Sequence, residues 1–233
     1  MNFSKITVFS GIVMAMLTSP VLSGVVLDGT RVIYPANKRD VTVRLTNMGE
    51  RPVLVQSWLD KGDESATPDK IVVPFMLAPP VNRIEPKRAQ SLRISTVRGA
   101  SLPQDRESIF WLNVLEIPAR PETAKAGDNY LQLAVRTRIK LFWRPVSLSG
   151  EAWQAPEGMV WTAENGGLKV QNPSPYHISL IEVAFNGKKY GADMILPHES
   201  QTVSIPSIAS GHSVTAFWLD DYGARREKRF TVN

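Results

Sequence analysis

Few side chains in this sequence could act as acids, bases or nucleophiles, and they are widely spaced. Three histidines occur, His177, His198 and His212. None has a second histidine or a carboxylate at the spacing that places metal ligands on one helix, and we expect each in a turn or on the surface. Ser200 and Ser204 lie near His198, but no nucleophile elbow surrounds them, and we expect both in loops.

The remaining motifs that could do chemistry also give no support for catalysis. Asp220 and Asp221 are adjacent acids that we expect in an exposed turn. There is no phosphate-binding glycine loop and no dinucleotide fingerprint. The sequence has no cysteine, which excludes thiolate nucleophiles, thiolate metal sites and disulfides. We therefore expect no catalytic residue, no metal, no cofactor and no enzymatic activity. A secreted hydrolase, which would need an acid, a base and a nucleophile converging in a pocket, is kept as an alternative.

Basic side chains are the other candidates for binding. The formal charge is +5, and the excess belongs to the first part of the chain. Residues 24–144 hold 19 Lys and Arg against 13 Asp and Glu, whereas residues 145–233 hold 7 against 9. Such an excess suits nucleic acid, anionic lipid or the carboxylates of a partner. Most of these basic residues stand singly within alternating strands, which predicts a solvated face for most of them.

Two segments, residues 102–119 and 130–145, organise the first part of the chain, and both read as strands. The second segment alternates strictly. One face carries Leu131, Leu133, Val135, Thr137, Ile139 and Leu141, and the other carries Gln132, Ala134, Arg136, Arg138 and Lys140. This alternation predicts a half-buried strand. We expect its first half to be an exposed apolar edge, of the kind that can add a strand to a partner, and its last apolar residues to lie in the core.

Short predicted strands separated by turns run along the whole chain. In the first part they cover residues 24–34, with a kink at 28–29, then 41–47, 53–59, 71–77 and 89–96, in addition to the two segments above. A cis bond at Pro79 or Pro80 is compatible with the turn there. In the second part they cover 166–173, 177–185, 194–196, 201–205, 213–219 and 228–232, with a hairpin signal at Asn186-Gly187.

This pattern predicts an all-β protein made of two immunoglobulin-like β-sandwiches. We place the first domain at residues 24–144 and the second, smaller one at 145–233, with an elbow at 143–145. The first 23 residues carry one charge, Lys5, and a short apolar run, and they predict a secretory signal peptide cleaved before Gly24. An uncleaved anchor is the alternative. Since no later apolar run is long enough to span a membrane, we expect a soluble, exported protein.

The segment 102–119 resembles the signature of the periplasmic pilus chaperones of the chaperone–usher pathway. The residues that carry the match are Pro103, Asp105, Arg106, Glu107, Ser108, Phe110, Trp111, Asn113, Ile117 and Pro118. The segments LDGTRVIYP, LAPPVNRIEP, IKLFWRP and LDDYGA support it, in order, along the mature chain. The resemblance implies two immunoglobulin-like domains set at an angle in an L or boomerang shape, with a cleft between them, in the periplasm.

The resemblance also implies a function, ATP-independent chaperoning of fimbrial subunits by donor-strand complementation. In that family the chaperone lends its last first-domain strand to a subunit that lacks a strand, until the outer-membrane usher exchanges it for the next subunit. The donor side chains implied here are Leu131, Leu133 and Val135. Arg31 and Lys140 are the implied anchor for the terminal carboxylate of the subunit.

The family further implies an interdomain ionic network, here Glu107, Arg144 and Asp221, which would fix the angle between the domains. Arg138 lies on the same strand face as Lys140 and is the rival anchor. The loop at residues 119–129 has no cysteine and resembles that of the short-loop, pilus-type subclass.

The expected partners are thus fimbrial subunits and an outer-membrane usher, with neither nucleic acid nor membrane insertion. Self-association of the free form through its exposed strand stays open. The alternative function is a secreted immunoglobulin-like binding module without a chaperone role. Such a module would need neither paired Arg31 and Lys140 in a cleft nor an exposed face at Leu131.

Overall fold

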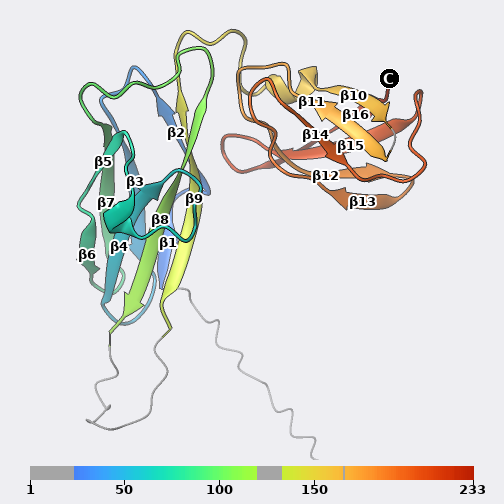
Figure 1. Ribbon diagram of the computed structural model, residues 1–233. Coiled ribbons are helices and arrows are strands. Elements are labelled where there is room, and N and C mark those ends of the chain that lie inside the picture. The colour runs from blue at the N-terminus through green and yellow to red at the C-terminus, as the bar shows by residue number, and fades with distance from the viewer. Residues whose placement is uncertain (1–23, 120–132, 165) are drawn as a thin grey trace, which may run out of the picture.

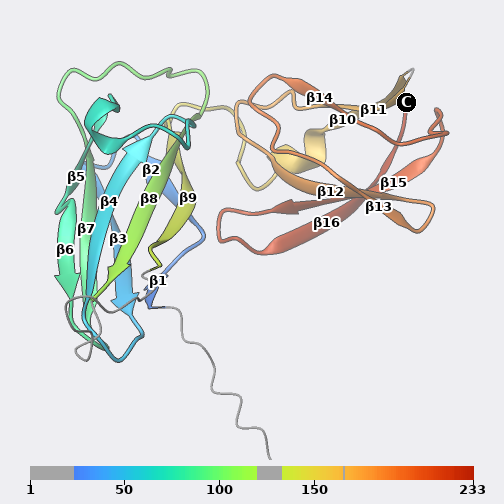
Figure 2. The ribbon, with the colours of Figure 1, turned by 60° about the horizontal axis from the view of Figure 1, so that its bottom comes forward.

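The computed structural model describes residues 24–119, 133–164 and 166–233. These residues form two β-sandwiches, each with its own buried core. The two domains lie side by side at an angle, as the arms of an L (Figures 1 and 2). The expected all-β, two-domain architecture is confirmed. The predicted signal peptide and Leu131 lie outside the described residues.

The first domain packs a four-stranded sheet against a five-stranded sheet. The smaller sheet has the order β1 (Val25–Leu27), β3 (Asp40–Asn47), β7 (Ala89–Thr96), β5 (Phe75–Ala78). The larger has the order β2 (Arg31–Pro35), β9 (Val135–Arg144), β8 (Ser108–Pro118), β4 (Val53–Asp60), β6 (Val81–Ile84). Alternate residues of both sheets point inward, so that Leu45 and Leu92 of one sheet share a core with Leu112 and Leu141 of the other.

The second domain is built on the same principle with shorter strands. One sheet has the order β10 (Val160–Glu164), β11 (Gly167–Gln171), β14 (Ser200–Val203). The other has the order β13 (Lys188–Gly191), β12 (Ser179–Phe185), β15 (Ser213–Leu219), β16 (Arg225–Thr231). The short helices η1 (Pro68–Lys70) and η2 (Ala155–Gly158) lie in connections. Trp161, Leu168 and Val183 are fully or almost fully buried between the sheets.

Strand β9 begins at Val135, later than the predicted residue 130, and ends at Arg144. Ile139 and Leu141 are buried, as predicted. Along its whole length β9 pairs antiparallel with β8, but β2 joins it on the other side only from Lys140 onward, in parallel. Within the described residues, the first half of β9 therefore has a strand partner on one side only.

Several predicted boundaries are wrong, and each error has a local reason. The segment predicted to start a strand at residue 102 enters β8 only at Ser108, because the N–H of Glu107 donates to the carbonyl of Pro175 in the other domain (2.9 Å). The strand expected at 194–196 is a single bridge between Ile178 and Ile195. Strands β6 and β10 were not predicted at all. The kink before β2, the turn between β12 and β13 and a cis Ala78–Pro79 bond agree with the sequence.

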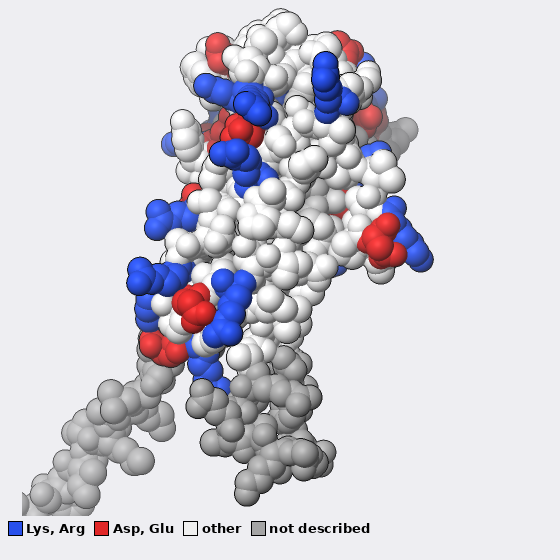
Figure 3. Space-filling model, turned by 90° about the vertical axis from the view of Figure 1, so that its left-hand side faces the viewer, with Lys and Arg blue, Asp and Glu red and all other residues white. Residues whose placement is uncertain are grey.

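Charged side chains on the first domain do not form a continuous patch on the face drawn in Figure 3. There Lys and Arg stand singly or beside Asp and Glu, separated by uncharged surface. Exposed ion pairs of the first domain include Arg83 with Glu85, Lys87 with Glu50, and Arg106 with Asp105. In the part of the chain that the structure describes, no helix is long and apolar enough to cross a membrane.

Candidate functional site

Arg31 and Lys140 are neighbours across the parallel pairing of β2 and β9, at the same register position. The residues beside them in each strand, Val32, Ile139 and Leu141, point into the first-domain core. The two cations therefore share the opposite face of the sheet. That face is turned toward the second domain, because the guanidinium of Arg31 reaches across to it.

The environment of the two cations favours an anion. The Nη1 of Arg31 donates to Ser179 Oγ (3.2 Å) and, at the limit of a hydrogen bond, to the carbonyl of Leu219 (3.4 Å), while its Nε is buried and has no partner among the described residues. Burial lowers the pKa of Lys140, the charge of Arg31 lowers it further, and Asp193 partly offsets both.

Burial also lowers the pKa of Arg31, against an opposing effect of the two neighbouring aspartates 220 and 221. Two half-buried cations thus lie side by side, and neither takes part in an ion pair with a described residue, whereas Arg138 and Arg144 do. A carboxylate placed between them would accept charge-assisted hydrogen bonds from both and would relieve their mutual repulsion.

Arg138, the rival anchor, is occupied by other contacts. Its Nη2 lies 2.6 Å from Asp60 Oδ1 and its Nη1 lies 2.9 Å from Glu64 Oε1. Its guanidinium also lies over the ring of Trp111, 4.7 Å from the centroid. Burial raises the pKa of Asp60, but hydrogen bonds from Arg138, Asn113 and the neighbouring backbone outweigh this and hold it below its usual value. The structure thus leaves Lys140, not Arg138, as the open cation of β9.

The apolar residues at the start of β9 face solvent. Leu133 precedes the strand and is 64% exposed, and Val135 is its first residue and is 55% exposed. Leu131, the third predicted donor residue, lies outside the described residues. Two aliphatic side chains next to an unpaired strand edge form a surface that an apolar groove with a free strand edge would complete.

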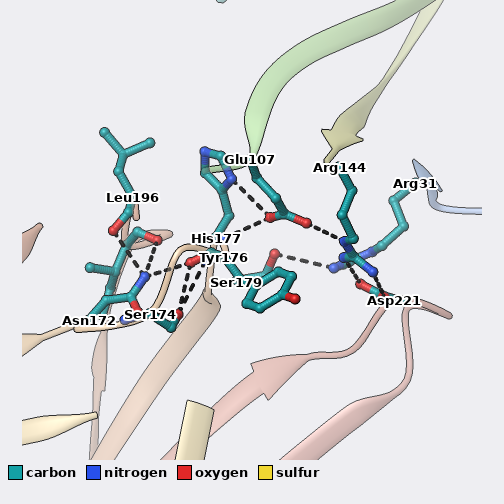
Figure 4. Close-up of polar contacts among 11 residues, drawn as sticks. Arg31, Glu107, Arg144, Asn172, Ser174, Tyr176, His177, Ser179, Leu196 and Asp221 are labelled. Carbon is teal, nitrogen blue, oxygen red and sulfur yellow. Dashed lines mark hydrogen bonds and ion pairs between the residues drawn. The ribbon is translucent and has the colours of Figure 1, made fainter. Parts of the chain in front are cut away.

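Glu107, Arg144 and Asp221 come together at the junction between the domains (Figure 4). Arg144 donates from Nε to Glu107 Oε1 (2.5 Å), and from Nη1 and Nη2 to the two oxygens of Asp221 (2.7 and 3.0 Å). Burial alone would lower the pKa of Arg144, but Asp221 and Glu107 together raise it. The side chain of Glu107 is only 1% exposed, so its pair with Arg144 within the first domain is largely dry. The pair that crosses to the second domain joins Arg144 to Asp221, whose side chain is 38% exposed.

His177 was expected on the surface or in a turn, and this expectation is wrong for its side chain, which is 2% exposed. The backbone N–H of His177 donates to Glu107 Oε2 (2.8 Å), and the ring Nδ1 lies 3.1 Å from the same oxygen. The sequence carries no local signal for this contact, because the partner is 70 positions away in the other domain.

Of the other candidate acids, bases and nucleophiles, Asp220 borders the junction. His198 and His212 are exposed, as predicted. Ser200 is the first residue of β14 and not a loop residue. Asp220 accepts from the turn N–H groups of Tyr222 (3.0 Å) and of residue 224 (2.9 Å), which agrees with a turn acid. Its expected exposure is wrong, because its side chain is only 13% exposed. Within the described ranges, no three His, Asp or Glu side chains are grouped so that they could hold a metal ion.

A cavity of about 470 Å³ lies at the junction of the two domains. Arg31, Phe142, Arg144 and His177 are among its lining residues. Arg31 and the ion pairs of Arg144 with Glu107 and Asp221 therefore border the same hollow, whereas Lys140 is not among its lining residues.

Comparisons with known proteins agree on one family. The family described as "Pili and flagellar-assembly chaperone, PapD N-terminal domain" matches residues 24–149, and "Pili assembly chaperone PapD, C-terminal domain" matches residues 154–230. The chain is 41% identical over 222 residues to the probable fimbrial chaperone YadV of Escherichia coli strain K12, covering 90% of each chain. It is 39% identical over 215 residues to the chaperone protein MrkB of Klebsiella pneumoniae, covering 90% of this chain and 92% of the relative.

A solved structure of the Salmonella enterica SafA pilin in complex with the SafB chaperone also matches. Its TM-score is 0.77 at 28% identity, and the match covers 91% of this chain and 98% of that chain. The crystal structure of the YadV chaperone gives a TM-score of 0.74 at 38% identity, covering 90% of this chain and all of that one.

Proposed function

The chain belongs to the family of PapD-like pilus-assembly chaperones, and from this premise we propose that it binds fimbrial subunits by donor-strand complementation and delivers them to an outer-membrane usher. The observation that carries the proposal is the pair of half-buried cations, Arg31 and Lys140, at one register position beside a strand with an open edge. The SafB chaperone, a structural neighbour, is solved in complex with a pilin.

In this proposal Arg31 and Lys140 bind the terminal carboxylate of the subunit. They are preorganised by the parallel pairing of β2 and β9, and no described carboxylate competes for them in an ion pair. Arg138 serves instead to hold the outer face of the sheet together through Asp60. The anchor then fixes the register of the subunit along β9, because a bound chain terminus defines where every following residue lies.

Leu131, Leu133 and Val135 are the donor side chains in the same proposal. Burying one large aliphatic side chain contributes about 1.5–3 kcal/mol, and main-chain hydrogen bonds along the open edge of β9 add to this. The exposure of Leu133 and Val135 supports their availability to a partner. No nucleotide is needed, because the binding free energy comes from strand pairing and burial.

The remaining parts of the proposal concern location and assembly. The protein acts in the periplasm after export by residues 1–23, and it has no catalytic role. Glu107, Arg144 and Asp221 set the angle between the domains at residues 24–144 and 145–233. The free form covers its open strand by pairing with itself, and the short, cysteine-free loop before β9 assigns it to the pilus-type subclass.

Co-purification from the periplasm tests the proposal. A fimbrial subunit from the source organism is co-expressed with wild type, Arg31→Ala, Lys140→Ala and Leu133→Asp. We expect an equimolar complex with wild type and loss of the subunit with each variant. Lys169→Ala, which removes an exposed ion pair of the second domain, is the matched control and should retain the subunit.

The outcomes separate the two candidate functions. If Arg31→Ala and Lys140→Ala keep the subunit while remaining folded, the anchor assignment is wrong. If wild type itself binds no subunit and does not keep it soluble, the protein is a binding module without a chaperone role.

A further inference from the structure

His177 connects the second domain to two residues of the first. Its backbone N–H and its ring nitrogen Nδ1 both face Glu107 Oε2, at 2.8 and 3.1 Å. Its ring lies 5.4 Å from the ring of Phe142, measured between centroids. Phe142 is buried on the outer face of β9, between Lys140 and Arg144 in the sequence. His177 is therefore held by an acid and an aromatic ring that line the same cavity as Arg31.

The contact with Glu107 requires a proton on Nδ1. Oε1 of Glu107 accepts from Arg144, and Oε2 accepts from the backbone N–H of His177. Both oxygens thus already serve as hydrogen-bond acceptors. A ring nitrogen 3.1 Å from Oε2 is stable there only as an N–H donor. Nδ1 is therefore the donor whether or not the other ring nitrogen is protonated.

The chain before His177 holds this donor in place. Asn172 is fully buried, and its Nδ2 donates to the carbonyl of Tyr176 (2.7 Å), while its Oδ1 accepts from the N–H of Ser174 (3.0 Å). These bonds close the turn that leads into His177 (Figure 4). The position of His177 is thus set from its own domain by Asn172 and from the other domain by Glu107.

The chain after His177 reaches the anchor. Ser179, the first residue of β12, accepts from Nη1 of Arg31 (3.2 Å), and the carbonyl of Leu219 beside it is the second acceptor (3.4 Å). Nε of Arg31 has no partner among the described residues. The direction of the guanidinium therefore depends on where β12 begins, and β12 begins two residues after His177.

We propose that His177 is a positioning residue for the carboxylate anchor. Its Nδ1–H bond to Glu107 fixes the start of β12 against the first domain, and Ser179 then directs Arg31 toward the site beside Lys140. The inference rests on the proposed function of Arg31 and Lys140 and adds a residue that touches neither the subunit nor the anchor.

Two substitutions separate the donor from the ring. His177→Asn places an amide N–H close to the position of Nδ1 and removes the ring, whereas His177→Phe keeps the ring against Phe142 and removes the donor. The probe is a synthetic peptide copying the C-terminal strand of the fimbrial subunit used for co-purification, with a free C-terminal carboxylate or a C-terminal amide. Calorimetry of the full-length protein gives the ratio of the two dissociation constants, amide over carboxylate.

We expect a high ratio in wild type and in His177→Asn, a ratio near unity in Arg31→Ala, and a ratio about tenfold below wild type in His177→Phe, the effect of losing one hydrogen bond to a charged group. The amide peptide should bind all four proteins alike, since it tests strand pairing without the anchor. A loss of folding would weaken both peptides and leave the ratio unchanged.

The outcomes distinguish this inference from the proposed function. If wild type shows no preference for the carboxylate, or Arg31→Ala keeps it, the anchor and this inference are both wrong. If Arg31→Ala behaves as expected but His177→Phe keeps the wild-type ratio, the inference alone is wrong. It is also wrong if His177→Asn loses the preference as fully as His177→Phe, because a donor at the position of Nδ1 is then not sufficient to hold the anchor.

Discussion

Replacing Glu107 by glutamine should destabilise the protein far more than the same change at an exposed ion pair. Both oxygens of Glu107 accept hydrogen bonds, one from Arg144 and the other from His177. The amide of glutamine would turn an N–H group toward one of these donors in either orientation. Removing one partner of a buried ion pair costs about 3–5 kcal/mol. Because Arg144 keeps its contact with Asp221, we expect the lower end, a loss of about 3 kcal/mol.

Urea denaturation followed by tryptophan fluorescence and by far-UV circular dichroism measures this loss. Coincidence of the two curves is the condition for using a single free energy of unfolding in a two-domain protein. The control is Glu164→Gln, which breaks the pair with Lys169, where both side chains are 42% exposed. We expect it to cost less than about 1 kcal/mol. A loss in Glu107→Gln no larger than that of the control would refute the view that the pair of Glu107 with Arg144 is buried and dry.

Two further predictions concern acid stability and strand packing. Since the pKa of Asp60 is held below its usual value when folded, its contribution is present above the unfolded-state pKa of about 3.9 and is lost as the pH falls through the lower, folded value. The difference in unfolding free energy between wild type and Asp60→Asn should therefore shrink in urea titrations below about pH 4, and a difference independent of pH would contradict this. Gly167→Ala should destabilise the second domain by about 1–3 kcal/mol, because the added Cβ meets backbone of β14, whereas Gly191→Ala, which meets nothing within 4 Å, should be nearly neutral in the same assay.

The elements with a clear period and clear turn residues could be predicted from the sequence. The alternation of β9 placed Ile139 and Leu141 in the core, and Asn186-Gly187 located the turn between β12 and β13, where both residues have positive φ (48° and 76°). Such features depend on neighbours in sequence and on the backbone freedom of glycine and asparagine. The start of β8 was misplaced because the N–H of Glu107 bonds across the junction, which no local pattern reveals.

The site was predictable only where a residue stands in a recognisable segment. Arg31, Lys140 and the junction residues were assigned through the family resemblance, and the structure brings Arg31 beside Lys140. Two facts were out of reach. Arg138 forms an ion pair with Asp60, 78 positions away, and His177 is buried against the first domain. Each depends on tertiary neighbours, so neither the type of residue nor its spacing could decide its role.

The parallel pairing of β2 with β9 has a consequence for the order of events during folding. Its two strands belong to opposite ends of the first domain, so this contact closes a loop of roughly a hundred residues, and such non-local pairing forms slowly. The cation pair therefore exists only in a first domain whose chain has been completed and whose sheet has closed. A chain that has not finished folding lacks the pair. The first domain must therefore fold before it can bind a fimbrial subunit through these two cations.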